Sequence, residues 1–457
     1  MPYTILATSG IPIPEDSNIP AAGLALKKPT EDDKKTSQAL GISFLNISLF
    51  LSTQWDPAMA RKGRGSRHRS LNRRRCRSKQ DGETTHGPYL VEVEHDGTLQ
   101  QNNTDKRLEH GSRVFLKLEL LQPSGSFKSR GIGNLILSTL KDPANAGKNV
   151  HFFISSGGNA GLAAVHAARD LGCPCTVVVP HSTKPFMISK LQAAGATAVI
   201  QQGASWFEAD TFLRKTYIDR PQEGTADDAG NATTNTVNVY VPPFDDPRVW
   251  AGAATMVEEI AAQLPPRPSS ESSSVFPADA IVCSVGGGGL FNGIVEGTTK
   301  CLQSSSSSVS SEHAPENKVH ILAAETQGAH SLAHSLHAGE LQSLSAITSQ
   351  ANALGALCVA RQAFVNATSP PPGVQVTSVV GSDAEAAKGI LRLADEARLE
   401  VELACGISVE VAIGGKLAEV LPGFGPESRV VVVVCGGSNI SAEMIAEYRR
   451  QLENGWE

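Results

Sequence analysis

Several common signatures are missing from this sequence, and each absence excludes a class of protein. The eight cysteines include no Cys-x-x-Cys pair, and several stand singly in apolar runs. This distribution indicates reduced thiols in an intracellular compartment rather than a disulfide framework. The apolar stretch from Leu40 to Leu51 is a dozen residues long, too short to cross a bilayer, and no secretory signal stands at the N-terminus. We therefore expect a cytoplasmic protein without a membrane segment.

Excess positive charge is also missing. The net charge is −6 with a pI near 6.1, which argues against the chain as a whole being a nucleic-acid binder. The exception is the stretch 61–79, where ten of nineteen residues are Lys or Arg. Such a block usually stays solvated, so residues 1–110 are predicted to be a divergent, largely disordered region. A nuclear-localisation or nucleic-acid role for the basic block stays open as the alternative.

From residue 111 onward, apolar strands alternate with helical stretches. Continuous apolar strands separated by helices predict an α/β fold with a parallel sheet covered on both faces. Three polar stretches, 220–235, 265–274 and 304–311, are predicted to be exposed loops. The strands are expected at 113–119, 150–154, 175–179, 198–200, 280–285, 319–324 and 429–434, with helices at 160–171, 184–194 and 291–299.

Lys128 is the strongest candidate for a catalytic residue. It follows a predicted strand and a Ser/Gly-rich turn, in the sequence QPSGSFKSRG (122–131), and it begins a predicted helix. A lysine held there forms a Schiff base with a carbonyl if desolvation lowers its pKa, since only the neutral amine attacks. A solvated surface lysine is the alternative for this motif taken alone.

Three glycine-containing turns follow other predicted strands. SSGGNAG (155–161) is a strand-to-helix turn suited to a carboxylate or phosphate, or merely a tight turn capped by Asn159. SVGGGGL (284–290) holds four consecutive glycines, whose entropic cost favours a phosphate cradle, although neither GxxxxGK[ST] nor GxGxxG is present. CGGSNIS (435–441) follows a valine-rich strand, and Cys435 is either a site residue or a buried structural thiol. Ligands of doubly wound folds lie at such strand ends, so one site could collect all these motifs.

Together these motifs resemble the L-serine/L-threonine dehydratases among the fold-type II pyridoxal 5′-phosphate (PLP) enzymes. PPFDDPRVW (242–250) and AETQGAHS (324–331) complete the resemblance, which spans about residues 111–450 in family order. It implies two open, twisted, mostly parallel sheets with helices on both faces. The implied domains are a large PLP-binding domain (111–119 and 246–457) and a small substrate-binding domain (120–245). It also implies a homodimer that binds a small amino acid.

The resemblance also implies a role for each matching residue. Lys128 matches the catalytic, PLP-bearing lysine. The cofactor-binding residues are Phe127, Asn159, Gly286, Gly287, Gly288, Gly289, Leu290 and Cys435, and those that bind the substrate are Ser156, Gly157, Asn159 and Ala160. Glu325 and Ala329, with carbonyls near Leu354 and Ala356, match a monovalent-cation site, with K⁺ as the expected ion.

The implied reaction is β-elimination from L-serine or L-threonine, giving pyruvate or 2-oxobutyrate and ammonia. Serine racemases are similar but place a serine where this chain has Gly157. The first alternative is therefore a racemase-like activity or that of another fold-type II PLP enzyme. The second is a catalytically impaired PLP-binding relative, because the Thr-Pro-Leu segment and helix that normally precede the first strand are not found in residues 89–110.

Overall fold

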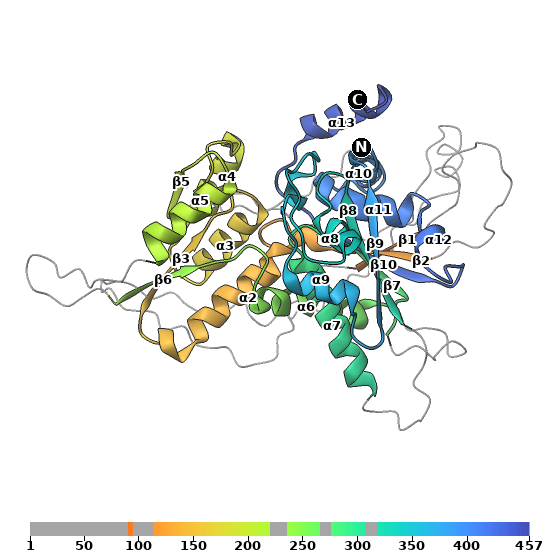
Figure 1. Cartoon of the computed structure of the whole chain (residues 1–457), viewed down its shortest axis with the longest axis horizontal. Coiled ribbons are helices and arrows are strands. Elements are labelled where there is room, and N and C mark those ends of the chain that lie inside the picture. Colours follow the sequence, from red (N-terminus) through yellow and green to blue (C-terminus); the bar gives the residue numbers. More distant parts are fainter. Residues whose placement is uncertain (1–89, 95–112, 220–234, 266–275, 307–317, 457) are drawn as a thin grey trace, which may run out of the picture. The chain divides into compact units, whose positions relative to one another are not determined.

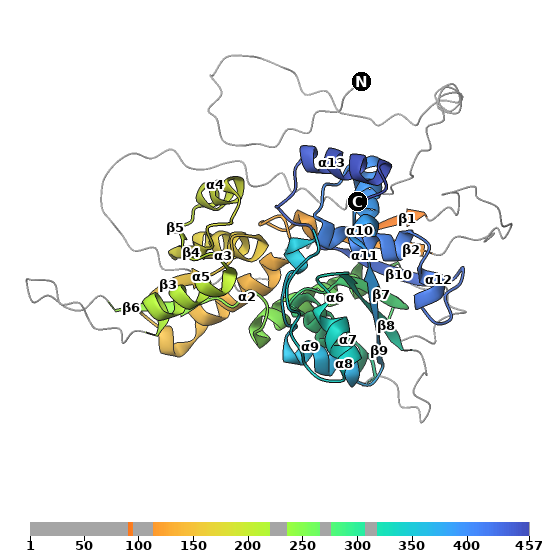
Figure 2. The same cartoon turned by 45° about the horizontal axis from the view of Figure 1, so that its top comes forward.

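The computed structural model describes residues 90–94, 113–219, 235–265, 276–306 and 318–456. Within these ranges the chain forms two sheets, each accompanied by helices (Figures 1 and 2). None of the described helices is long and apolar enough to cross a membrane.

The smaller sheet has four parallel strands in the order β5-β4-β3-β6. Its strands are β3 (Asn149–Ile154), β4 (Cys175–Val179), β5 (Ala198–Gln201) and β6 (Thr236–Tyr240), and its helices are α2 (Lys128–Lys141), α3 (Asn159–Asp170), α4 (Pro185–Ala194) and α5 (Trp206–Leu213). Alternate side chains of β3 face opposite layers: Phe152 packs in the cluster with α2, α3 and α4, whereas Phe153 packs with α5. This two-sided burial explains why the central strand β4, buried at every residue, is almost uniformly apolar.

The larger sheet has six strands in the order β1-β2-β10-β7-β8-β9, parallel except for β1. The strands are β1 (Leu90–Glu94), β2 (Arg113–Leu118), β7 (Ala280–Ser284), β8 (Val319–Thr326), β9 (Val374–Gly381) and β10 (Arg429–Val434). The helices that follow α5 in the chain are α6 (Pro247–Gln263), α7 (Gly289–Ser306), α8 (Ser331–Ala338), α9 (Arg361–Thr368), α10 (Asp383–Arg392), α11 (Leu403–Ile413), α12 (Leu417–Val420) and α13 (Ala442–Glu453).

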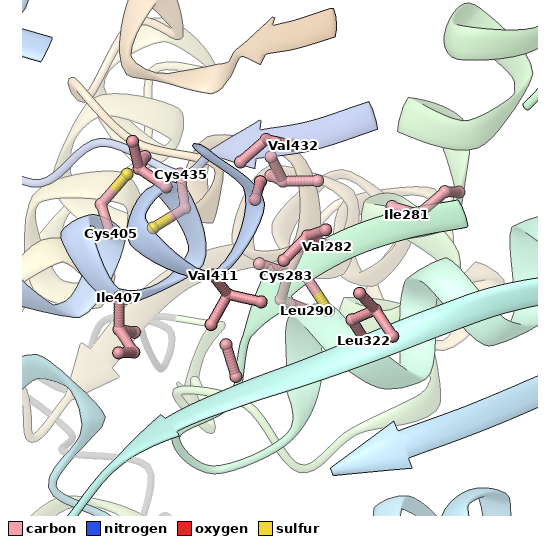
Figure 3. Packing of buried hydrophobic residues seen from close by; sticks show 14 of the residues in the cluster. Ile281, Val282, Cys283, Leu290, Leu322, Cys405, Ile407, Val411, Val432 and Cys435 are labelled. Atoms are coloured by element: carbon pink, nitrogen blue, oxygen red, sulfur yellow. The ribbon is translucent and has the colours of Figure 1, made fainter. Parts of the chain in front are cut away.

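Helix α11 lies against the centre of this sheet. Almost every residue of α11 is buried. Its residues Cys405, Ile407 and Val411, labelled in Figure 3, belong to the same core cluster as Val282 of β7 and Val432 of β10. A helix that is apolar all round is what such a fully enclosed position requires. The core therefore fixes the carboxyl ends of β7 and β10 relative to α11.

The alternation of strands and helices confirms the predicted α/β fold with two mostly parallel sheets. The seven expected strands and three expected helices are present, with ends shifted by a few residues, α7 running furthest beyond its expected end. The strands β1, β6 and β9 were not predicted. The three predicted loops lie almost wholly outside the described residues, although Ser304–Ser306 belong to α7.

Strand β1 is the described part of residues 1–110. It lies within the N-terminal region that was predicted to be largely disordered, and it pairs antiparallel with β2 along its whole length. Its sequence LVEVE alternates apolar and acidic residues, the pattern of a strand with one exposed face, but it is short and stands in polar surroundings. The rest of that region lies outside the described residues, and the division into domains stays a prediction.

Candidate active site

The predicted site residues follow the carboxyl ends of strands from both sheets. Lys128 lies beyond β2, the Ser156–Ala160 loop follows β3, the four glycines follow β7, Glu325 ends β8, and Cys435 follows β10. Residues that follow parallel strands gather at one edge of their sheet, which explains why motifs far apart in the sequence can share a site.

Lys128 is the first residue of α2, and its amine is enclosed by protein. Its Nζ donates a hydrogen bond to the carbonyl oxygen of Pro243 at 2.6 Å and lies 5.2 Å from the centre of the Phe127 ring. Desolvation lowers the pKa of Lys128 to about 8, against an opposing influence of Cys435. The site thus holds a lysine from which a proton is easily removed.

The turn that carries Lys128 is clamped to the turn after β10. The Phe127 amide donates to the Cys435 carbonyl at 3.1 Å, the Gly437 amide donates to the Gly125 carbonyl at 3.0 Å, and Ser126 forms a β-bridge with Gly436. Gly436 has φ +84°, and a Cβ there would lie 2.5 Å from the Gly125 carbonyl oxygen. Only a glycine permits this close approach, so the Gly-Gly sequence positions the lysine.

Asn159, the first residue of α3, contacts the same C-terminal turn. Its Oδ1 accepts from the Ser438 amide at 2.9 Å, and its Nδ2 donates to Oε1 of Glu402 at 3.1 Å. That Glu402 oxygen also accepts from the Asn439 amide at 2.6 Å. Glu402 was missed from the sequence because it belongs to none of the motifs and lies between two helices.

The other residues of the Ser156–Ala160 loop are closely packed. Ala160 is buried, and the Gly158 amide donates to Ser156 Oγ at 3.4 Å. A Cβ on Gly157 would lie 2.8 Å from Cγ2 of Thr183, so this position has little room for a side chain.

The four glycines form a turn that tolerates no side chains as it stands. A Cβ on Gly287 would lie 2.4 Å from the Phe244 ring, and one on Gly289 would lie 2.9 Å from the Phe244 carbonyl oxygen. Gly288 has φ +91°, and a Cβ on Gly286 would lie 3.1 Å from Cα of Leu354. The turn leads directly into α7, whose first backbone N–H groups have no partner within the helix, an arrangement suited to a phosphate.

Leu290 and Cys435 border this turn from the core. The Leu290 side chain lies in the hydrophobic cluster, as Figure 3 shows, so any contact with a ligand would have to come from its backbone. Cys435 is buried, with Sγ 3.5 Å from the Ser284 hydroxyl and hydrogen-bonded to the thiol of Cys405. Cys435 therefore presents a sulfur atom near Lys128.

The predicted cation ligands are buried at the end of β8. Both carboxylate oxygens of Glu325 accept backbone N–H groups at 2.9 Å, from Leu332 and Ala333 at the start of α8. Burial raises the pKa of Glu325 to about 7, against the opposing effect of these two hydrogen bonds. Ala329 is also buried, and the Leu354 carbonyl accepts from the Ala356 amide at 2.7 Å. In the described residues no cluster of three His, Cys, Asp or Glu side chains could hold a metal ion.

Comparison with known proteins decides the family. The family model described as "Pyridoxal-phosphate dependent enzyme" matches residues 100–436. The chain belongs to this family. It is 35% identical over 339 residues to the catabolic L-serine/threonine dehydratase of Saccharomyces cerevisiae, covering 74% of this chain and 86% of that protein. It is 36% identical over 351 residues to the human L-serine dehydratase/L-threonine deaminase, covering 75% and 90%.

A solved structure agrees with this assignment. The crystal structure of a fungal L-serine ammonia-lyase from Rhizomucor miehei has a TM-score of 0.60 and 31% sequence identity, and the match covers 75% of this chain and 94% of that one. The likeness confirms the predicted fold-type II architecture, with helices on both faces of two mostly parallel sheets.

The residues of this PLP-family member fit the cofactor. Lys128, with its lowered pKa, offers an amine that can react with an aldehyde, and the turn of four glycines that leads into α7 is suited to a phosphate. The hydrogen bond from Lys128 to Pro243 and the contact of Phe244 with Gly287 link the two features through adjacent residues. The roles of the individual site residues stay predictions.

Proposed function

We propose that this chain is a PLP-dependent L-serine and L-threonine dehydratase, which converts its substrate to pyruvate or 2-oxobutyrate with release of ammonia. The observation that carries the proposal is the enclosed Lys128 amine, clamped between the turns after β2 and β10. The names of the yeast, human and fungal relatives support the substrate and the reaction.

The pKa of Lys128 suits both attack on an aldehyde and removal of a proton. With a pKa of about 8, roughly a tenth of the amine is neutral at pH 7, whereas a free lysine would be neutral in only about one molecule in three thousand. Enclosure thus raises the reactive fraction by about 300-fold. Lys128 is the group we assign to removing the proton from Cα of the substrate.

PLP, when bound, withdraws electrons from Cα and so makes loss of this proton and of the β-hydroxyl feasible. We assign the phosphate to the turn of Gly286, Gly287, Gly288 and Gly289 with the Leu290 backbone, and the pyridine ring to the space beside Phe127, Asn159 and Cys435. A buried thiol is a weaker partner for a ring nitrogen than a carboxylate, which favours prompt elimination over a long-lived carbanion.

The substrate carboxylate is assigned to the loop Ser156–Ala160, where the N-terminal end of α3 attracts an anion. Gly157 argues against the racemase alternative. A racemase needs a second proton donor on the opposite face, glycine provides none, and Thr183 stands 2.8 Å from where a side chain would begin.

The remaining assignments concern a cation site, the assembly and the location of the protein. Glu325 is a buried carboxylate with no ion pair among the described residues, and together with the carbonyls near Leu354 and Ala356 it offers the oxygen ligands that K⁺ takes. We also propose a homodimer and a cytoplasmic location, the latter because Cys175, Cys283, Cys358, Cys405 and Cys435 are free thiols.

The test is a coupled assay of keto-acid release from L-serine, L-threonine and D-serine by the PLP-loaded protein, in K⁺ buffer and in tetramethylammonium buffer. We expect release from the two L-amino acids, faster in K⁺, and none from a Lys128→Ala variant. D-serine formed from L-serine without pyruvate would establish the racemase alternative instead. A protein that binds PLP but converts none of these substrates would establish the catalytically impaired alternative.

A further inference from the structure

Glu402 lies beside the proposed site, and none of the assignments above uses it. It is the residue immediately before α11 and is 5% exposed. Burial raises the pKa of Glu402, against hydrogen bonds from Asn439, Asn159 and Ser438 and the charge of Lys190. No salt bridge to this carboxylate is found among the described residues, so its charge is compensated mainly by N–H donors.

The position of Glu402 constrains the orientation of the Asn159 amide, because one carboxylate oxygen accepts hydrogen bonds from both Asn159 and Asn439. Oε1 of Glu402 accepts from the Asn439 backbone N–H, which can only donate, so the nitrogen of the Asn159 amide, and not its oxygen, must face this acceptor. The oxygen then faces the Ser438 amide at 2.9 Å, which only donates. Both neighbours therefore select the same orientation of the amide.

This orientation determines what Asn159 can offer a ligand. An amide nitrogen carries two N–H groups, and Glu402 takes one of them at 3.1 Å, which leaves the second for a bound oxygen atom. A flipped amide would present an acceptor instead and would repel a carboxylate or phenolate oxygen.

The same glutamate also holds the turn that clamps Lys128. Its Oε1 accepts from the Asn439 amide at 2.6 Å, and a Cβ on the neighbouring Gly437 would lie 2.3 Å from the Glu402 carboxyl carbon. From the other side, Lys190 of α4 donates to the Ser438 carbonyl. Glu402 is thus packed directly against the Gly437–Asn439 segment.

We propose that Glu402 is a positioning residue, which fixes the Asn159 amide with one N–H directed at the ligand and holds the Gly437–Asn439 turn in place. The ligand-directed part of this inference depends on the proposed function, through the role assigned to Asn159. The contact itself does not depend on it, so the two can be tested separately.

The variants distinguish the loss of the hydrogen-bond acceptor at position 402 from the loss of its charge and from a change in side-chain volume. Glu402→Met removes the acceptor at similar size, whereas Glu402→Gln keeps an oxygen for the Asn159 and Asn439 donors. Glu447→Met is the matched control, since Glu447 lines the same cavity of about 290 Å³ as Glu402 but bonds to Arg450 and Gln451.

The first measurement concerns the apoprotein. Unfolding by urea is compared for the wild type, Glu402→Met, Asn159→Ala and the double variant. We expect the effects to be strongly non-additive, with a coupling of about tenfold in the unfolding equilibrium constant, because the two side chains share a hydrogen bond to a charged group. Additive effects would contradict the Asn159–Glu402 hydrogen bond on which the proposal depends, whatever the activity of the wild type.

The second measurement concerns the PLP-loaded enzyme. In Glu402→Met we expect kcat/KM for L-serine to fall by about 10- to 100-fold, the range that a hydrogen bond to a charged group represents. The visible absorption band of the cofactor should shift as well. Glu402→Gln should restore most of both, and Glu447→Met should match the wild type. Wild-type kinetics and absorption in Glu402→Met would overturn the proposal, as would losses in Glu402→Gln as large as those in Glu402→Met. An inactive wild type would contradict the proposed function instead. The coupling measured by urea unfolding would still show whether Glu402 and Asn159 interact.

Discussion

Replacement of Arg130 should destabilise the protein more than replacement of any exposed arginine. Arg130 follows Lys128 in the first turn of α2, and its side chain is only 7% exposed. It makes five hydrogen bonds: two to Glu119, two to Glu259 and one to the Thr255 hydroxyl. Burial alone would lower the pKa of Arg130, but the hydrogen bonds to the two glutamates outweigh it and raise the pKa. The guanidinium thus joins α2 to α6 and to Glu119, the residue that directly follows β2.

The expected loss in the free energy of unfolding follows from the hydrogen bonds that the two glutamates would keep in an Arg130→Met variant. Glu259 would keep Lys117 at 2.6 Å, whereas Glu119, which is fully buried, would lose both bonds to the guanidinium and keep the Gln122 amide at 3.2 Å. An uncompensated buried charge of this kind costs about 3–5 kcal/mol. Lysine cannot reproduce the paired hydrogen bonds to both glutamates, so Arg130→Lys should also lose stability, though less.

The assay is urea unfolding followed by tryptophan fluorescence, with Arg169→Met as the control. Arg169 is 47% exposed and pairs with Asp170, an exposed ion pair worth about 0–1 kcal/mol. Adding Glu119→Gln should recover part of the loss. A deficit below about 1 kcal/mol would refute the reasoning.

Two further predictions concern the cofactor site. Gly287→Ala should weaken PLP binding, measured by titration of the visible absorbance, because its Cβ would strike the Phe244 ring at 2.4 Å; Gly133→Ala, with no atom within 4 Å, should bind normally. The rate of covalent PLP attachment to the apoprotein, measured by stopped-flow absorbance, should rise with pH up to about 8 and then level off, since the neutral fraction of Lys128 rises through its lowered pKa. A rate still rising steeply to pH 10 would contradict the desolvation of this amine.

Much of the fold could be predicted because it depends on local pattern. Long apolar strands such as β4 and β10, separated by amphipathic or alanine-rich helices, indicate a parallel sheet whatever the remainder of the chain does. The missed strands had weaker signals. All five residues of β6 are only partly buried, β9 is buried mainly at its ends, and β1 is short and surrounded by polar residues.

The motifs of the candidate site could also be found, because each combines an unusual local sequence with a strand end. What could not be found were the residues that support them. Pro243 contributes a backbone carbonyl, which carries no side-chain signal. Glu402 is a single acidic residue whose partners lie 243 positions earlier and 37 positions later. Arg130 was visible in the QPSGSFKSRG motif, but its two glutamate partners were not.

The sequence by itself determined the α/β class, the family resemblance and the candidate catalytic and binding residues, because strand periodicity and glycine-rich turns are local properties of the chain. Only the tertiary structure decided which distant groups meet them. The lowered pKa of Lys128 comes from the protein that encloses it, and the orientation of the Asn159 amide comes from Glu402 and the Ser438 backbone. Desolvation and hydrogen-bond partnership are properties of packing, and packing is set by contacts between residues that the chain separates widely.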